Sequence, residues 1–152
     1  DKLIDAGVQI IWQTGKAYYN VVFPELGKYD KRRIRVFDFL KEMDLAYAAA
    51  DVVISRSGAL AVSELCIANK PCILVPSPNV AEDHQTKNAM ALVKKDAALL
   101  VKDTEAGEQL YPAALTLMAD TARQQQLSTN IQKLAQPQAA TAIVNELLNI
   151  LP

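Results

Sequence analysis

The stretch SRSGALAVSELCIANKPCILVPSP, residues 55–78, is the most informative about the fold because its pattern predicts a strand end, a helix and a second strand in immediate succession. We expect the chain to turn at Ser57 and Gly58 and a helix to follow over 59–69. The apolar run over 71–76 then predicts another strand. Two strands joined by one helix run parallel, so this stretch predicts one unit of a parallel α/β sheet.

The same alternation of short apolar runs and helical patterns continues on both sides of this stretch. Strands rich in β-branched or aromatic residues are predicted over 8–13, 33–39, 51–55, 71–76 and 97–101. Helices are predicted between them over 15–28, 41–50, 59–69 and 83–95, and only helices follow residue 104. We therefore expect the Rossmann-like α/β class, a parallel sheet with helices on both faces, in a single domain over residues 1–152.

Length, charge and cysteine content exclude several classes of protein. The 152 residues suffice for one domain, and the net charge of -1 produces no overall field that favours nucleic acid or anionic lipid. No apolar run reaches the roughly 18 residues of a membrane span and no signal-peptide pattern opens the chain, so we expect a cytoplasmic protein. Cys66 and Cys72 lack the spacing of zinc or redox sites and are predicted to be buried, reduced thiols.

A candidate ligand site follows the strand that ends at residue 55. In parallel α/β sheets, ligands bind beyond the carboxyl ends of the strands. Ser57 and Gly58 allow a sharp turn there, and the next three residues open a helix with no side chain large enough to block an anion. These three are Ala59, Leu60 and Ala61. Their amides predict a phosphate site.

Glu64 and Arg56 extend this candidate site. At a helical rise of about 1.5 Å per residue, Glu64 lies roughly 7 Å beyond the first amides, near the phosphate-to-ribose separation of a nucleotide. Its carboxylate could accept hydrogen bonds from two vicinal hydroxyls, or it could be a solvated helix residue. Arg56 could neutralise a diphosphate or pair with a surface carboxylate. The residues alone leave both questions open.

The loop after residue 76 leads to His84, the only histidine, and Gln85 at the start of the next helix. Taken alone, these are polar first-turn residues, and His84 has no nucleophile pattern around it. Gly15 and Lys16 do not form a Walker A loop, because Ile10 stands where its first glycine is required.

Four segments together resemble the carboxyl-terminal domain of the MurG family: IIWQTGK, VFDFLKEMDLAYAAADVVISRSGALAVSEL, KPCILVPSP and EDHQTKNAMAL. These bacterial enzymes transfer N-acetylglucosamine from UDP-N-acetylglucosamine to undecaprenyl-pyrophosphoryl-N-acetylmuramyl-pentapeptide in peptidoglycan synthesis. The resemblance runs in order over nearly the whole chain. It implies the GT-B architecture, in which two Rossmann-like domains face each other across a cleft, and it implies that this chain is most of the donor-binding half.

The resemblance also implies a role for each residue at the end of the third strand. Glu64 matches the glutamate that binds the ribose hydroxyls, and Arg56 matches an arginine near the diphosphate. The turn and helix start that meet the diphosphate and sugar match Ser57, Gly58, Ala59, Leu60 and Ala61. Ala61 departs from the threonine that some members carry.

Three further positions of the donor site come from other loops. Leu40 matches a hydrophobic position whose backbone reads the uracil edge. Gln85, with His84 before it, falls where the family places polar side chains against the N-acetylglucosamine hydroxyls. His84 departs from the glutamine of some members.

The implied chemistry is transfer with inversion at the anomeric carbon, with no cofactor and no metal. The partners implied are UDP-N-acetylglucosamine, the amino-terminal acceptor domain of the same protein and, through that domain, the lipid-linked acceptor. The catalytic base belongs to that domain, so residues 1–152 alone are expected to be inactive. The full-length enzyme is expected to be peripheral on the inner face of the cell membrane.

Two other functions stay open from the residues. One is another GT-B enzyme, such as a UDP-N-acetylglucosamine 2-epimerase, which shares the architecture and the ribose glutamate. The other is a non-catalytic nucleotide-binding module.

The first residues, DKLIDAG, look like the end of a helix closed by Gly7, so we expect a preceding segment to have been removed. In the family, a central strand comes before that helix. The sheet should therefore be interrupted between the strands at 8–13 and 51–55.

Overall fold

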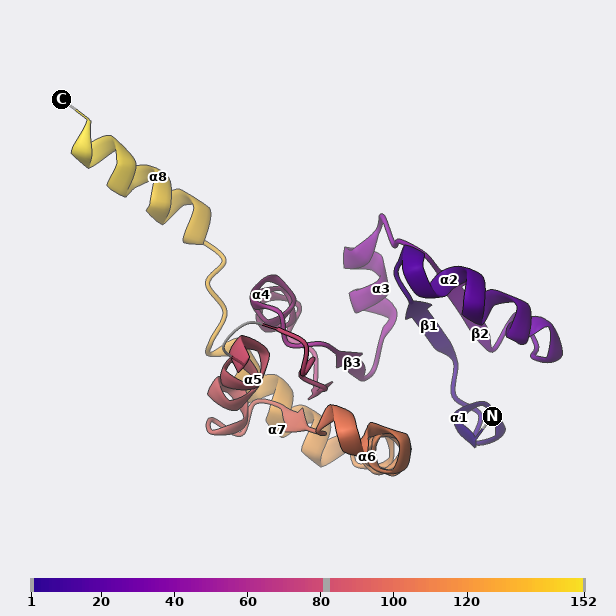
Figure 1. Ribbon diagram of the computed structural model, residues 1–152. Helices are drawn as coiled ribbons and strands as arrows, with labels where there is room; N and C mark the ends of the chain where they lie inside the picture. The colour runs from indigo at the N-terminus through magenta and orange to yellow at the C-terminus, as the bar shows by residue number, and fades with distance from the viewer. Residues whose placement is uncertain (1, 81–82, 152) are drawn as a thin grey trace. The chain divides into compact units, whose positions relative to one another are not determined.

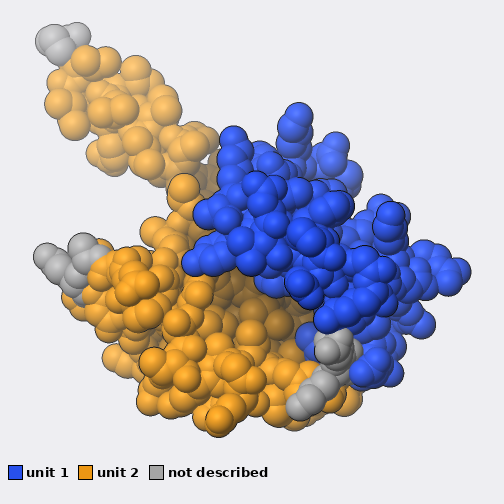
Figure 2. All heavy atoms as spheres, turned by 45° about the vertical axis from the view of Figure 1, so that its right-hand side comes forward, with its two compact units in different colours: residues 1–50 blue, residues 51–152 orange. Residues whose placement is uncertain are grey.

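The computed structural model describes residues 2–80 and 83–151 (Figure 1). The chain divides into two compact units, residues 1–50 and residues 51–152, which are blue and orange in Figure 2. The expectation of a single domain over residues 1–152 stays a prediction.

Unit 1 contains a two-stranded parallel sheet. Its elements are α1 (Lys2–Asp5), β1 (Ile10–Gln13), α2 (Lys16–Val22), the 3-10 helix η1 (Phe23–Lys28), β2 (Ile34–Phe37) and α3 (Met43–Ala49). In the pairing of β1 with β2, Ile10 lies opposite Ile34 and Trp12 opposite Val36. Gly7 has a φ of 84° and follows α1, which confirms the predicted helix end. Every described side chain of this unit is half-buried or exposed.

Unit 2 contains a three-stranded parallel sheet followed by helices. Its elements are β3 (Val53–Ser55), α4 (Ala59–Ala68), β4 (Cys72–Leu74), α5 (His84–Val93), β5 (Leu99–Leu100), the 3-10 helix η3 (Asp103–Glu105), α6 (Ala106–Ala119), α7 (Thr121–Gln132) and α8 (Ala139–Ile150). The strand order is β3-β4-β5, so β4 pairs on both sides. Both pairings are parallel, as helix-connected strands require.

The hydrophobic core among the described residues lies in unit 2. The three residues of β4 have no exposed surface, which is typical of a central strand covered on both faces. The helices contribute Leu65, Leu117, Leu127 and Ile131, each at most 1% exposed. Burying one such side chain stabilises the fold by about 1.5–3 kcal/mol. The apolar side chains of α8, in contrast, are exposed.

Cys66 and Cys72 are free thiols and are both buried, which confirms their predicted state. Burial raises the pKa of the Cys66 thiol and raises the pKa of Cys72 to about 12. Both groups are therefore protonated at neutral pH, and a protonated buried thiol is a poor nucleophile.

The predicted fold class is confirmed, and each of the five predicted strands is present. The helix predicted over 15–28 differs, because an α-helix ends at Val22 and a 3-10 helix begins at Phe23. Pro24 lies in the first turn of that 3-10 helix, where its missing N–H has no partner to lose. Among the described residues β1 and β3 belong to different sheets, so the predicted interruption is also present. In those same ranges, no helix combines the length and apolar character that crossing a bilayer requires.

Candidate functional site

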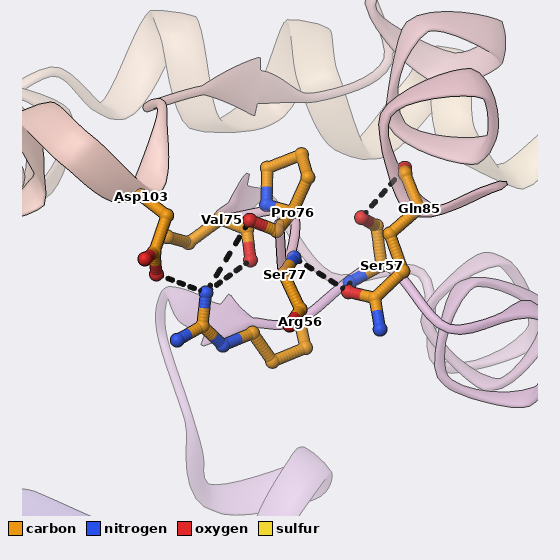
Figure 3. Close-up of polar contacts among 7 residues, drawn as sticks. All are labelled: Arg56, Ser57, Val75, Pro76, Ser77, Gln85 and Asp103. Carbon is orange, nitrogen blue, oxygen red and sulfur yellow. Dashed lines mark hydrogen bonds and ion pairs between the residues drawn. The ribbon is translucent and has the colours of Figure 1, made fainter. Parts of the chain in front are cut away.

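The loops that follow β3, β4 and β5 lie at one edge of the unit 2 sheet, because the three strands are parallel neighbours. These loops contain Arg56 and Ser57 after β3, Ser77 after β4 and Asp103 after β5 (Figure 3). This is the edge at which ligands bind in parallel α/β sheets.

The start of α4 offers backbone amides to this edge. Gly58 is the N-cap residue and no side chain caps the helix. The first turn therefore keeps amides without intrahelical acceptors, and the positive end of the helix dipole lies with them. Ala59 and Leu60 are exposed, Leu60 to 81%, and Ala61 is half-buried. An anion could therefore reach these amides.

The prediction that Gly58 allows the turn through the conformational freedom of glycine is wrong. Its φ is -60° and its ψ is 149°, a conformation that any residue adopts, so the turn does not need glycine. A Cβ atom built at Gly58 meets nothing within 4 Å. The space beside this residue is therefore open, and glycine keeps it open for a close approach to the backbone.

Ser57 is completely buried and is bound through three of its groups to α5. Its amide donates to Gln85 Oε1 at 3.2 Å and its hydroxyl donates to the Gln85 carbonyl oxygen at 2.8 Å. Its own carbonyl oxygen accepts from Asn88 Nδ2 at 3.0 Å. These bonds fix the residue that comes immediately before the N-cap of α4. The direct contact with a ligand expected of Ser57 stays a prediction.

The carboxamide of Gln85 joins two loops (Figure 3). Its Oε1 accepts from the Ser57 amide and from the Ser77 amide, the latter at 2.9 Å. Two backbone donors on one atom identify that atom as the oxygen. The Nε2 group makes no hydrogen bond with the residues that the structure describes, and it is the part of this side chain that could donate to a ligand.

Arg56 is held at the ends of all three strands. Its Nη1 donates to the carbonyl oxygens of Val75 at 3.2 Å and Pro76 at 3.4 Å, and it forms an ion pair with Asp103. Of the two roles left open for Arg56, the structure therefore shows the pairing with a carboxylate. All hydrogen bonds from its guanidinium to described residues involve Nη1, so the edge formed by Nε and Nη2 could bind an anion as well.

Glu64 and His84 are both exposed. Glu64 lies on α4, one and a half turns beyond the amides, and His84 is the first residue of α5. Residues 81 and 82 of the loop that leads to His84 lie outside the described residues. No group of three or more His, Cys, Asp or Glu that could hold a metal ion is found in the ranges that the structure describes.

Leu40 lies in unit 1, after β2. Its amide donates to Gln13 Oε1 at 2.7 Å, so this backbone group has an acceptor within the same unit. Leu40 also lines an open pocket of unit 1 together with Ile11, Arg35, Phe37, Glu42, Leu45 and Ala46. Its role in reading a uracil edge stays a prediction.

Sequence reasoning missed Asp103, Asn88 and Ser77. Asp103 follows the strand predicted over 97–101, so the strand-end rule pointed to its loop but not to the residue. Asn88 lies one turn beyond Gln85 on the same face of α5, a spacing that could have suggested a shared target. Nothing in the sequence indicates that Ser77 would donate its amide to Gln85.

The chain is similar to glycosyltransferases over nearly its whole length. The model of the family described as "Glycosyltransferase family 28 C-terminal domain" matches residues 1–143. A protein of Cytophaga hutchinsonii named UDP-N-acetylglucosamine--N-acetylmuramyl-(pentapeptide) pyrophosphoryl-undecaprenol N-acetylglucosamine transferase is 53% identical over 99% of this chain and 40% of its own length. The protein of the same name from Parabacteroides distasonis is 51% identical over 99% of this chain and 41% of its own length.

A solved structure agrees with these sequence matches. The crystal structure of Acinetobacter baumannii MurG superposes with a TM-score of 0.80 at 26% identity, over 93% of this chain and 41% of that chain. The chain thus spans about two fifths of the length of the curated relatives that it matches.

Proposed function

Because this chain belongs to the family of glycosyltransferase family 28 C-terminal domains, we propose that it is the donor-binding part of an N-acetylglucosaminyltransferase. The enzyme moves N-acetylglucosamine from UDP-N-acetylglucosamine to undecaprenyl-pyrophosphoryl-N-acetylmuramyl-pentapeptide, a step in building peptidoglycan. The observation that carries the proposal is the 53% identity, over 99% of this chain, to a relative whose name states this transfer. The candidate site supports it, because it combines an uncapped helix start with an arginine at the sheet edge where ligands bind.

Each part of the site takes one part of the donor. The amides of Ala59, Leu60 and Ala61 and the free edge of Arg56 bind the diphosphate. Glu64 accepts hydrogen bonds from the two ribose hydroxyls. Gln85 donates from Nε2 to a sugar hydroxyl, with His84 beside it, and the Leu40 backbone reads the uracil edge.

The chemistry is a substitution at the anomeric carbon of the sugar. An acceptor hydroxyl attacks that carbon as the bond from the carbon to the UDP oxygen breaks, and the configuration inverts. UDP leaves with the electron pair of the broken bond, so negative charge grows on the diphosphate. The helix start and Arg56 stabilise that charge from fixed positions, which lowers the barrier.

The acceptor binds to another domain of the full-length protein, and that domain also supplies the base that removes the proton from the acceptor hydroxyl. We therefore expect residues 1–152 alone to transfer no sugar. The lipid-linked acceptor places the full-length enzyme on the inner face of the cell membrane as a peripheral protein.

Replacement of Glu64 in the full-length protein tests the donor site. Glu64→Ala removes two charge-assisted hydrogen bonds worth about 1.5–3 kcal/mol each before water compensates. We expect UDP affinity to fall roughly tenfold or more, with Glu64→Gln between wild type and Glu64→Ala. Isothermal titration calorimetry measures the change, and Ser63→Ala, at the exposed neighbouring position, is the matched control.

Two further measurements make this test specific. Wild type should bind 2'-deoxy-UDP less tightly than it binds UDP. The Glu64→Ala variant should bind the two ligands with about the same affinity. Equal UDP affinity in wild type and both Glu64 variants would show that Glu64 does not bind the ribose hydroxyls. Product analysis of the full-length protein, with UDP-N-acetylglucosamine and the lipid-linked acceptor, separates transfer from epimerisation of the donor.

A further inference from the structure

We propose that Asp103 is a positioning residue for Arg56, holding the guanidinium so that its Nε and Nη2 edge remains available to a diphosphate. The inference rests on the proposed function, because that function supplies the anion. Neither the family description nor the names of the relatives assign a role to Asp103.

The geometry of Arg56 carries this proposal. One nitrogen, Nη1, has contacts with three acceptors: the carbonyl oxygens of Val75 and Pro76 and the carboxylate of Asp103 (Figure 3). Nη1 carries two hydrogens, so the three acceptors must share them. The two carbonyl contacts, at 3.2 and 3.4 Å, are at the long end of hydrogen-bond distances. Asp103 is therefore the partner that determines where Nη1 lies.

Burial and local structure favour an orienting role. The side chains of Arg56 and Asp103 are 54% and 32% exposed, so water screens their mutual attraction. An exposed arginine without an anchor would sample many rotamers and would lose that freedom each time an anion bound. Asp103 itself begins η3, which is closed by the bond from the Glu105 amide to the Lys102 carbonyl oxygen at 3.0 Å. The carboxylate is thus presented from an ordered turn.

Asp103 also brings a negative charge close to the proposed diphosphate. This charge repels the diphosphate and weakens anion binding, whereas orientation of Arg56 strengthens it. Screening reduces a repulsion between exposed charges, whereas the loss of orientation is not screened. We therefore expect the removal of Asp103 to weaken anion binding. If the repulsion were the larger effect, removal of Asp103 would strengthen anion binding instead.

The test is titration of UDP into the full-length protein and four variants. Asp103→Ala removes the anchor, Arg56→Gln removes the guanidinium, and a third variant combines both changes. Glu105→Ala is the matched control, since it removes another carboxylate of the same turn. The Glu105 side chain is 39% exposed, and it pairs with Lys102 instead of Arg56. We expect Asp103→Ala to weaken UDP binding about three- to tenfold and Glu105→Ala to change it less than about twofold.

The double variant separates positioning from a general effect on the fold. If Asp103 acts through Arg56, Asp103→Ala has no further effect on UDP affinity in the Arg56→Gln background. Unchanged or tighter UDP binding by Asp103→Ala would overturn the proposal. An equal loss in both backgrounds would overturn it as well.

A readout without nucleotide keeps this test independent of the proposed function. The NMR cross-peak of the Arg56 Nε–H group is assigned by its absence in Arg56→Gln. We expect it to shift or broaden in Asp103→Ala and to stay unchanged in Glu105→Ala. If the wild-type protein binds no UDP, the proposed function fails, and an unaltered cross-peak in Asp103→Ala then overturns the positioning role by itself.

Discussion

The carboxamide of Gln85 should stabilise the fold through its oxygen, and this can be measured apart from any role in binding. Gln85→Met keeps the length of the side chain but removes the atom that accepts from the Ser57 and Ser77 amides. Gln85→Glu is the matched control, because a carboxylate oxygen can accept from the same two amides.

The magnitude follows from the burial of the two donors. Ser57 has no exposed surface, so its amide would be left without an acceptor at a cost of about 1–2 kcal/mol, the lower part of the usual range because this bond is 3.2 Å long. Ser77 is half-buried and water can replace part of its bond, so its loss adds about 0.5–1 kcal/mol. We therefore expect Gln85→Met to lower the free energy of unfolding by about 1.5–3 kcal/mol.

Urea denaturation of the full-length protein, followed by circular dichroism, measures this loss. Gln85→Glu should unfold at nearly the wild-type urea concentration, yet bind UDP-N-acetylglucosamine more weakly because it lacks the Nε2 donor. A Gln85→Met variant within about 0.5 kcal/mol of wild type would show that the bridge between the two loops contributes little to stability.

Two further predictions follow from the pKa shifts. Because burial raises the pKa of Cys66 and raises the pKa of Cys72 to about 12, we expect neither thiol to react with Ellman's reagent at pH 8 in the native protein, and both to react in denaturant; rapid native reaction would contradict their burial. Hydrogen bonds from Arg123, at 2.6 and 2.9 Å, hold the pKa of Asp96 below its usual value. The pair therefore stabilises the fold fully at pH values above the unfolded pKa of about 3.9. This stabilisation is lost as the pH falls through the lower pKa of the folded state. Asp96→Asn should therefore lower the melting temperature at pH 7, and its difference from wild type should shrink toward pH 2; a difference independent of pH would contradict this assignment.

The strands of both sheets could be predicted from the sequence because they are short, apolar and separated by helical patterns. Cys72, Ile73 and Leu74 form a continuous apolar run, and they occupy the strand that pairs on both sides. The helix predicted over 15–28 has Pro24 in its interior, where proline breaks an α-helix, so the end of α2 before Pro24 was predictable. The 3-10 helix that follows has no comparable signal in the sequence.

The candidate site could be predicted only in part. The strand-end rule identified the loop of Arg56 and the helix start after Gly58. Side-chain pairing over long separations has no local signal, so the bond between Arg56 and Asp103 could not be read from the sequence. The orientation of Gln85 was also inaccessible, since the same residue could have directed its oxygen toward a ligand instead of two backbone amides.

The order of the strands in unit 2 allows its sheet to form one strand at a time. Val53 pairs with Cys72, and Ile73 pairs with Leu99, so each strand adds beside the strand that precedes it in the sequence. Every pairing therefore closes a loop of a single helical connection, which keeps the entropic cost of closure small. Such a sheet can grow one strand at a time while the ribosome is still synthesising the helices that follow.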